Sequence, residues 1–138
     1  MIDKVIIPAA GQGTRLKPHT HTKPKPMIRL AGKPIIGHII EGLKEIKPKE
    51  IIVVVGYKKE ELINYLDRAF PKLNITYVEQ EKQLGLGHSI YVTKEHVDGS
   101  CMILLGDMLF ENSYKKFIEK HRENGTAQGS IGAVSYTH

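Results

Sequence analysis

Short apolar runs recur along the chain, separated by segments whose apolar residues fall at three- and four-residue spacing. The runs are rich in β-branched residues and nearly free of charge, a pattern typical of strands buried on both faces of a sheet. They predict five strands: Val5 to Ile7, Ile51 to Val55, Ile75 to Val78, Met102 to Leu105, and Ser130 to Val134.

The segments between the runs predict amphipathic helices, because residues at this spacing share one helix face. Prolines support the boundaries: Pro34 can open the first helix, Pro48 follows its end, and Pro71 closes the second. The apolar sets are Ile36, Ile39, Ile40, Leu43 and Ile46; Leu62, Ile63, Leu66 and Phe70; and Tyr114, Phe117, Ile118 and His121. A shorter helix is expected over Gly87 to Glu95, and Glu111 to Ser113 are expected to cap the last helix.

Strands and helices alternate, which predicts an α/β fold with a mostly parallel, doubly wound, Rossmann-like sheet. Ligands of such sheets bind beyond the carboxyl ends of the strands. Three segments follow those ends: Pro8 to Pro26, Gly56 with Tyr57, and Gly106 to Phe110. We therefore expect the functional residues in these segments.

Composition narrows the class of protein. The 138 residues, 41% hydrophobic and 25% charged, suit one globular domain over residues 1–138, with no repeat or linker. No apolar run approaches the roughly 18 residues that span a bilayer, so we expect no membrane association and a cytoplasmic location. The single cysteine, Cys101, lies in an apolar run, which predicts a buried, inert thiol. A net charge of +5 favours anionic partners.

A glycine- and alanine-rich loop follows the first predicted strand, from Ala9 through Gly13 to Thr14. Small residues let the backbone approach a ligand, and consecutive N–H groups turned toward one point bind phosphate oxygens. Arg15 and Lys25 bring positive charge to the same region. The prolines at 18, 24 and 26 predict an extended segment behind the loop in place of a helix.

Two better-known phosphate-binding motifs fit this loop poorly. The dinucleotide fingerprint needs a third glycine where the chain has Leu16, and the P-loop needs Lys followed by Ser or Thr where it has Thr14 and Arg15. A plain glycine turn with solvated lysines would be a purely structural explanation of the loop. His19 and His21 lack the further ligands that a metal site needs.

The loop and two later motifs together resemble the sugar-1-phosphate nucleotidyltransferase family. The motifs are AAGQGTRL, KPKPM and GKPII near the start, QEKQLGLGH over residues 80–88, and LLGDMLF over residues 104–110. The resemblance covers Ile2 to about Phe110. It implies the nucleotide-diphospho-sugar transferase variant of the Rossmann-like fold.

The resemblance also implies residue roles. Ala10, Gly11, Gly13 and Thr14 would bind the nucleotide, and Gln80 with Gly85 would line the base pocket. Arg15 and Lys25 would be catalytic, gripping the outer phosphates and the α-phosphate respectively. Asp107 would bind Mg²⁺, a role that a carboxylate at a strand end also favours on chemical grounds, with a helix cap as the competing explanation.

The reaction implied is nucleotidyl transfer from a nucleoside triphosphate to a sugar-1-phosphate, with release of pyrophosphate. Glucose-1-phosphate with dTTP or UTP is the pair that the resemblance favours. Members of the family are usually longer, so we expect a C-terminally truncated fold, little activity from these residues alone, and an exposed sheet edge that favours pairing with another chain, including homo-oligomers. The tail 133–138 resembles a translated transposon end used in library preparation, which makes a non-native tail one interpretation.

Three rival functions stay open on the sequence. The basic stretch from Arg15 to Lys33 could contact nucleic acid, but residues 9–34 contain no aromatic side chain for base stacking, so we expect no nucleic-acid partner. The chain could instead be a regulatory nucleotide-binding module, or a transferase acting on a phosphoalcohol or a molybdenum cofactor. His88 and Tyr57 could contact the nucleotide or simply pack.

Overall fold

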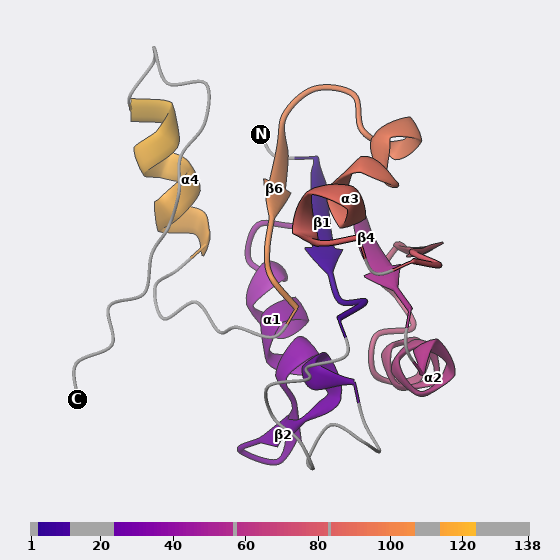
Figure 1. Ribbon diagram of the computed structural model, residues 1–138. Helices are drawn as coiled ribbons and strands as arrows, with labels where there is room; N and C mark the ends of the chain where they lie inside the picture. The colour runs from indigo at the N-terminus through magenta and orange to yellow at the C-terminus, as the bar shows by residue number, and fades with distance from the viewer. Residues whose placement is uncertain (1–2, 12–23, 57, 83, 107–113, 124–138) are drawn as a thin grey trace, which may run out of the picture.

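The computed structural model describes residues 3–11, 24–56, 58–82, 84–106 and 114–123. Four strands form one sheet: β1 (Lys4–Pro8), β4 (Glu50–Val55), β5 (Ile75–Glu79) and β6 (Cys101–Ile103). All neighbouring pairs are parallel, and the order across the sheet is β5-β4-β1-β6 (Figure 1). The predicted parallel α/β sheet is therefore confirmed.

The strand order contains a reversal beside β1. The chain steps from β1 to β4 and then to β5 on one side, and returns to the other side of β1 for β6. Connections on the two sides run in opposite directions, so their loops separate at the carboxyl ends of β1 and β6. This topological switch point is where an open α/β sheet offers room for a ligand.

The register places apolar residues in rows that cross the whole sheet. Val5 pairs with Ile51 and Met102, and Ile51 pairs in turn with Ile75. Because side chains alternate between faces along a strand, such a row lies on a single face. This row belongs to the larger core, whereas Ile6 and its β4 partner Ile52 belong to a smaller core on the opposite face.

Helices cover both faces, as a doubly wound sheet requires. The larger core is completed by α1 (Ile35–Leu43), α2 (Lys59–Ala69) and α4 (Tyr114–Glu123). On the opposite face, α3 (Leu86–Tyr91) lies against β1 (Figure 1), and the 3₁₀ turn η4 (Lys94–His96) follows it. Val92 and Val97, which flank η4, pack against the smaller core.

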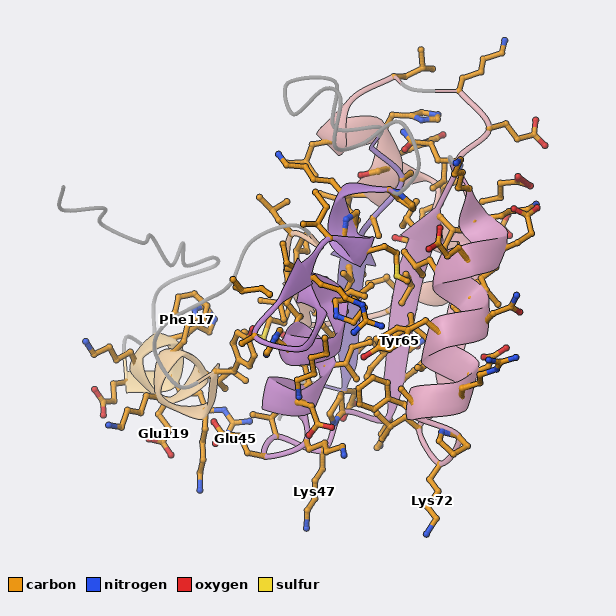
Figure 2. All side chains as sticks on the ribbon, turned by 90° about the horizontal axis from the view of Figure 1, so that it is seen from below. Glu45, Lys47, Tyr65, Lys72, Phe117 and Glu119 are labelled. Atoms are coloured by element: carbon orange, nitrogen blue, oxygen red, sulfur yellow. The ribbon has the colours of Figure 1, made fainter. Side chains whose placement is uncertain are left out.

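Two glycines of α1 allow its neighbours to come close. A Cβ at Gly37 would overlap the hydroxyl of Tyr65 on α2, and one at Gly42 would lie 2.7 Å from the ring of Tyr114 on α4. Figure 2 shows Tyr65 in the seam between α1 and α2. In the same view Glu45 lies between α1 and α4, where its Oε1 accepts a hydrogen bond from the Lys115 backbone N–H at 3.1 Å.

Several predicted bounds are corrected. The first helix ends at Leu43, and Ile46 packs on the core from the following turn. The helix predicted over Gly87 to Glu95 is divided into α3 and η4. The last described strand ends at Ile103, before the predicted Leu105. Cys101 is partly buried against the smaller core, so the predicted buried thiol is corrected to a partly buried one.

A small antiparallel ribbon was not predicted. It consists of β2 (Arg29–Leu30) and β3 (Lys33–Pro34), joined by Ala31 and Gly32, which both have positive φ. The ribbon lies beyond the carboxyl end of β1, at the bottom of the view in Figure 1. The strand expected over 130–134 and the cap at 111–113 lie outside the described residues. Nowhere in the described ranges is a helix both long and apolar enough to cross a bilayer.

Candidate nucleotide-binding site

The loops after β1 and β6 are joined directly at the switch point. The Leu104 N–H donates to the Ile6 carbonyl at 2.9 Å, which continues the strand pairing one step past β6. The Gly106 N–H then donates to the Pro8 carbonyl at 3.0 Å. On the other side, the Ala9 N–H donates to the Val54 carbonyl at 2.9 Å. The start of the glycine-rich loop is thus held between its two neighbouring strands.

The approach of these two loops depends on small side chains. A Cβ at Gly106 would lie 2.9 Å from the Pro8 carbonyl oxygen and 3.1 Å from the Ala9 Cβ, so close that one of these groups would have to shift. Ala9 belongs to the larger core and Ala10 to the smaller one, and both are buried. The strand alternation therefore continues through Ala10, with alanine in place of larger apolar residues. The backbone first becomes exposed at Gly11.

Lys25 begins a single 3₁₀ turn, η3 (Lys25–Met27), so the end of the segment predicted to be extended is corrected to one turn. Pro24 has extended dihedrals, and the Met27 N–H donates to its carbonyl at 2.9 Å. Pro26 occupies an early turn position, where its missing N–H costs nothing. Met27 inserts into the larger core and is only 6% exposed. This anchor fixes the backbone that carries the Lys25 ammonium.

Gln80 and Gly85, the two predicted base-pocket residues, are in direct contact. The Gln80 backbone N–H donates to the Val55 carbonyl at 2.8 Å, which extends the pairing of β5 with β4. The residue is only 4% exposed. Its amide nitrogen Nε2 lies 3.3 Å from the Gly85 carbonyl oxygen and 2.9 Å from His88 Nδ1. The loop therefore folds back on the strand end that precedes it.

Gly85 has the backbone conformation that allows this return. Its φ of 97° and ψ of 177° fall in a region that is essentially restricted to glycine. A Cβ there would meet no described atom within 4 Å, so the requirement for glycine is conformational and not steric crowding. Gly85 is the N-cap of α3, and α3 carries His88.

An ion pair links the start of α2 to the end of β5. Lys59 at the start of α2 contacts the Glu79 carboxylate at 2.8 Å, directly before Gln80 in sequence. The hydrogen bond that Lys59 donates to the Glu79 carboxylate raises the pKa of Lys59 above its ordinary value. Lys58, the N-cap of α2, has a left-handed backbone conformation with a φ of 53°. The start of α2 is therefore held beside the strand end that leads to Gln80.

The structure places five of the predicted site residues, and they fall on three segments at the carboxyl ends of the strands. Ala10 and Gly11 follow β1, Gln80 and Gly85 follow β5, and Lys25 lies on η3. The other four, Gly13, Thr14, Arg15 and Asp107, lie outside the described residues, as do His19, His21 and Tyr57. Sequence reasoning left the role of His88 open between nucleotide contact and packing, and missed its hydrogen bond to Gln80.

The sequence matches the family described as nucleotidyl transferase over residues 4–138, almost its whole length. The chain belongs to the nucleotidyl transferase family. The resemblance inferred from the loop motifs is thereby confirmed.

Two similar nucleotidyl transferases illustrate the range of the family. A UTP–glucose-1-phosphate uridylyltransferase of Haloferax volcanii is 38% identical over 121 residues, covering 88% of this chain and 50% of that protein. The bifunctional protein GlmU of Methanococcus maripaludis is 48% identical over 126 residues, covering 91% of this chain and 29% of that protein. The chain thus spans half or less of the length of these relatives.

Solved nucleotidyl transferase structures share the fold. A UDP-glucose pyrophosphorylase crystallised with UDP-glucose superposes with a TM-score of 0.77 at 27% identity, covering 91% of this chain and 55% of that one. HddC from Yersinia pseudotuberculosis, crystallised with GMP-PN, gives a TM-score of 0.75 at 31% identity, covering 86% and 54%. The predicted nucleotide-diphospho-sugar transferase type of α/β fold is confirmed by these neighbours.

Proposed function

We propose that this protein transfers a nucleotidyl group from a nucleoside triphosphate to a sugar-1-phosphate and releases pyrophosphate. The observation that carries the proposal is the backbone hydrogen bond from the Gly106 N–H to the Pro8 carbonyl at the switch point. It joins the strand end before the glycine-rich loop to the strand end before Asp107. Nucleotidyl transfer needs phosphate binding and metal binding. The two segments to which we assign these functions therefore begin at adjacent points of the backbone.

The phosphates are assigned to the first of these loops. Ala10, Gly11, Gly13 and Thr14 bind by backbone N–H groups, as small residues after a buried strand favour. Arg15 holds the outer phosphates and Lys25 the α-phosphate. The anchored turn of Lys25 supports this role, because a cation on a fixed backbone loses less entropy when it meets an anion.

The base is assigned to the loop after β5. Gln80 is buried at a strand end, and Gly85 brings the backbone against it. UTP or dTTP with glucose-1-phosphate is the pair we favour, supported by the activity for which the Haloferax volcanii relative is named. The HddC structure holds a guanine nucleotide analogue, so the family fold also accepts a purine.

The chemistry is an exchange of one phosphorus–oxygen bond for another. A phosphate oxygen of the sugar-1-phosphate attacks the α-phosphorus, and the bond from the α-phosphorus to the bridging oxygen breaks as pyrophosphate leaves. The attacking oxygen is already ionised, so no general base is needed. The protein's contribution is to hold two anions in line and offset their repulsion. Arg15 and Lys25 supply fixed positive charge for this.

Magnesium fits the residues that are present. No group of three His, Cys, Asp or Glu side chains able to hold a metal occurs within the described ranges. Mg²⁺ commonly needs no such cage, because one or two carboxylates and substrate phosphates bind it together. Asp107 would supply the carboxylate, and the bound ion would neutralise charge on the phosphates.

Because these residues alone are expected to have little activity, the test is pyrophosphate release by the full-length gene product, measured over UTP, dTTP, GTP and CTP with several sugar-1-phosphates. Arg15→Ala, Lys25→Ala and Asp107→Ala should each lower the rate by at least about tenfold, since each removes charge from the transferring group. Lys72→Ala is the matched control. Lys72 precedes β5, so it belongs to the amino-end edge of the sheet, and Figure 2 shows it pointing outward.

Release that requires both magnesium and a sugar-1-phosphate would support the proposal. Nucleotide binding without release under every substrate pair would favour the regulatory nucleotide-binding module instead. If the wild-type chain binds no nucleoside triphosphate, the assignment of the glycine-rich loop is wrong.

A further inference from the structure

The Gln80 side-chain amide has a fixed orientation. A glutamine amide carries two N–H donors on Nε2 and one acceptor, Oε1. Here Nε2 faces two acceptors, the Gly85 carbonyl oxygen at 3.3 Å and His88 Nδ1 at 2.9 Å. Rotating the amide by half a turn would bring Oε1 against the Gly85 carbonyl, where two acceptors repel. The contact with a carbonyl therefore decides which end of the amide points inward.

This orientation also decides the protonation of His88. An imidazole nitrogen that accepts an N–H hydrogen bond must carry a lone pair, so Nδ1 is unprotonated and the proton of the neutral ring resides on Nε2. The ring is partly buried and lies beside Tyr91, one helical turn along α3, with the two ring centroids 6.5 Å apart and the ring planes at 28° to each other. Lys94 covers the same tyrosine ring at 4.5 Å. His88 is therefore in contact with the Gln80 amide at Nδ1 and flanked by the Tyr91 ring.

We propose that His88 is a positioning residue that selects the nucleobase through Gln80. With both amide N–H groups committed inside the protein, Gln80 offers its carbonyl oxygen to the ligand. That oxygen accepts a hydrogen bond from a base with a ring N–H beside a carbonyl, as in uracil, thymine and guanine. Cytosine presents a ring acceptor at the equivalent position, and could offer its exocyclic amine only by shifting in the pocket. This inference rests on the proposed function.

UTP and CTP form the test pair, because their rings have the same size and differ in this donor and acceptor pattern. Their dissociation constants would be measured by calorimetry with Mg²⁺ present. The wild-type chain should prefer UTP by about tenfold or more, as expected when the wrong base leaves buried polar groups unpaired. His88→Ala should reduce that preference by about fivefold, the change expected from one net neutral hydrogen bond.

Two substitutions separate positioning from packing. His88→Asn keeps an acceptor at the same number of bonds from Cα as Nδ1, so it should retain the preference within about twofold of wild type. His88→Gln moves its acceptor to the position of Nε2 and should behave like His88→Ala. His96→Asn is the matched control, because His96 lies near the start of β1, where its carbonyl accepts a hydrogen bond from Lys4.

A readout independent of nucleotide is the tautomer of His88, obtained from imidazole ¹⁵N chemical shifts of the wild-type chain at neutral pH. A protonated Nε2 with bare Nδ1 is expected, and a protonated Nδ1 would overturn the inference. So would an unchanged UTP preference in His88→Ala, or equal behaviour of His88→Asn and His88→Gln. If no nucleoside triphosphate binds to the wild-type chain, the proposed function fails as well. A failure confined to the base preference refutes this inference alone.

Discussion

Replacing Gly106 by alanine tests the packing on which the switch point depends. The new methyl group would lie 2.9 Å from the Pro8 carbonyl oxygen and 3.1 and 3.3 Å from Ala9 Cβ and Cα. Most of these neighbours are backbone atoms, and the Ala9 N–H donates a hydrogen bond to the Val54 carbonyl. They therefore cannot swing aside as a flexible side chain would. Overpacking of this kind costs about 1–3 kcal/mol.

Urea unfolding followed by circular dichroism measures this cost. With a denaturant slope of about 1.5 kcal/mol/M, a loss of about 2 kcal/mol would lower the midpoint by roughly 1.3 M. The affinity for the magnesium complex of UTP should fall as well, because relief of the overlap requires the backbone before Asp107 to move away from the backbone before the glycine-rich loop. Both effects are expected from the same displacement.

Gly87→Ala is the control for the loss of a glycine. Gly87 lies inside α3, and an added Cβ would have no described atom within 4 Å. Alanine is the better helix former there, so stability should stay the same or rise by up to about 1 kcal/mol. If Gly106→Ala unfolds at the wild-type urea concentration and binds UTP normally, the close approach at the switch point is not required and the reasoning is refuted.

Three further changes test other parts of the structure. Gly85→Ala should cost about 1–3 kcal/mol in urea unfolding and weaken UTP binding, because its φ of 97° is unfavourable for alanine; equal stability would contradict the conformational argument. Gly37→Ala should destabilise the chain by about 1–3 kcal/mol, and adding Tyr65→Phe should recover part of that loss, since the overlap is with the hydroxyl; a double-mutant cycle with zero coupling would refute it. Thr76→Val should lower stability at pH 7, with the difference from wild type shrinking in urea titrations as the pH falls below about 4.5. The hydrogen bond from Thr76, followed by Lys4, holds the pKa of Glu50 below its ordinary value of 4.5, so its contribution is present above that pH and is lost as the pH falls through the folded pKa; a difference independent of pH would show that this carboxylate is not involved.

Periodicity located most of the fold, because the sheet and the helices of the larger core obey the simple rules of burial. Val5 to Ile7 and Ile51 to Val55 are nearly continuous apolar runs, and both are central strands. The β2–β3 ribbon has no such pattern. Its turn consists of Ala31 and Gly32, and Ala31 has a φ of 51°, which alanine seldom adopts. The Asn-Gly pair that usually predicts a tight hairpin is therefore missing from the sequence.

The candidate site was predictable as a set of segments, but not as a set of contacts. Parallel strands bring their carboxyl ends to one edge, so Ala10 and Gly11 could be assigned there from topology, whereas Gln80 was assigned only through the family resemblance. The hydrogen bond from Gln80 to His88 joins residues eight positions apart through a glycine whose dihedrals no helical or strand period reveals. Likewise, Gly106 shows in the sequence as a flexible residue, whereas the backbone it meets belongs to a strand almost one hundred positions earlier.

Under the proposed function, the same small residues serve stability and ligand binding at the switch point, which would couple the two properties. Ala9 and Ala10 continue the alternation of β1 into opposite cores, so each is fixed by packing on its own face. The small side chain of Ala9 leaves space for the loop after β6, and Gly106 occupies that space. A larger residue at position 9 would fill more of the core yet separate the two loops, and a larger residue at 106 would separate them from the other side. The spacing between the glycine-rich loop and the backbone at Gly106 is therefore set by the packing of Ala9 in the hydrophobic core.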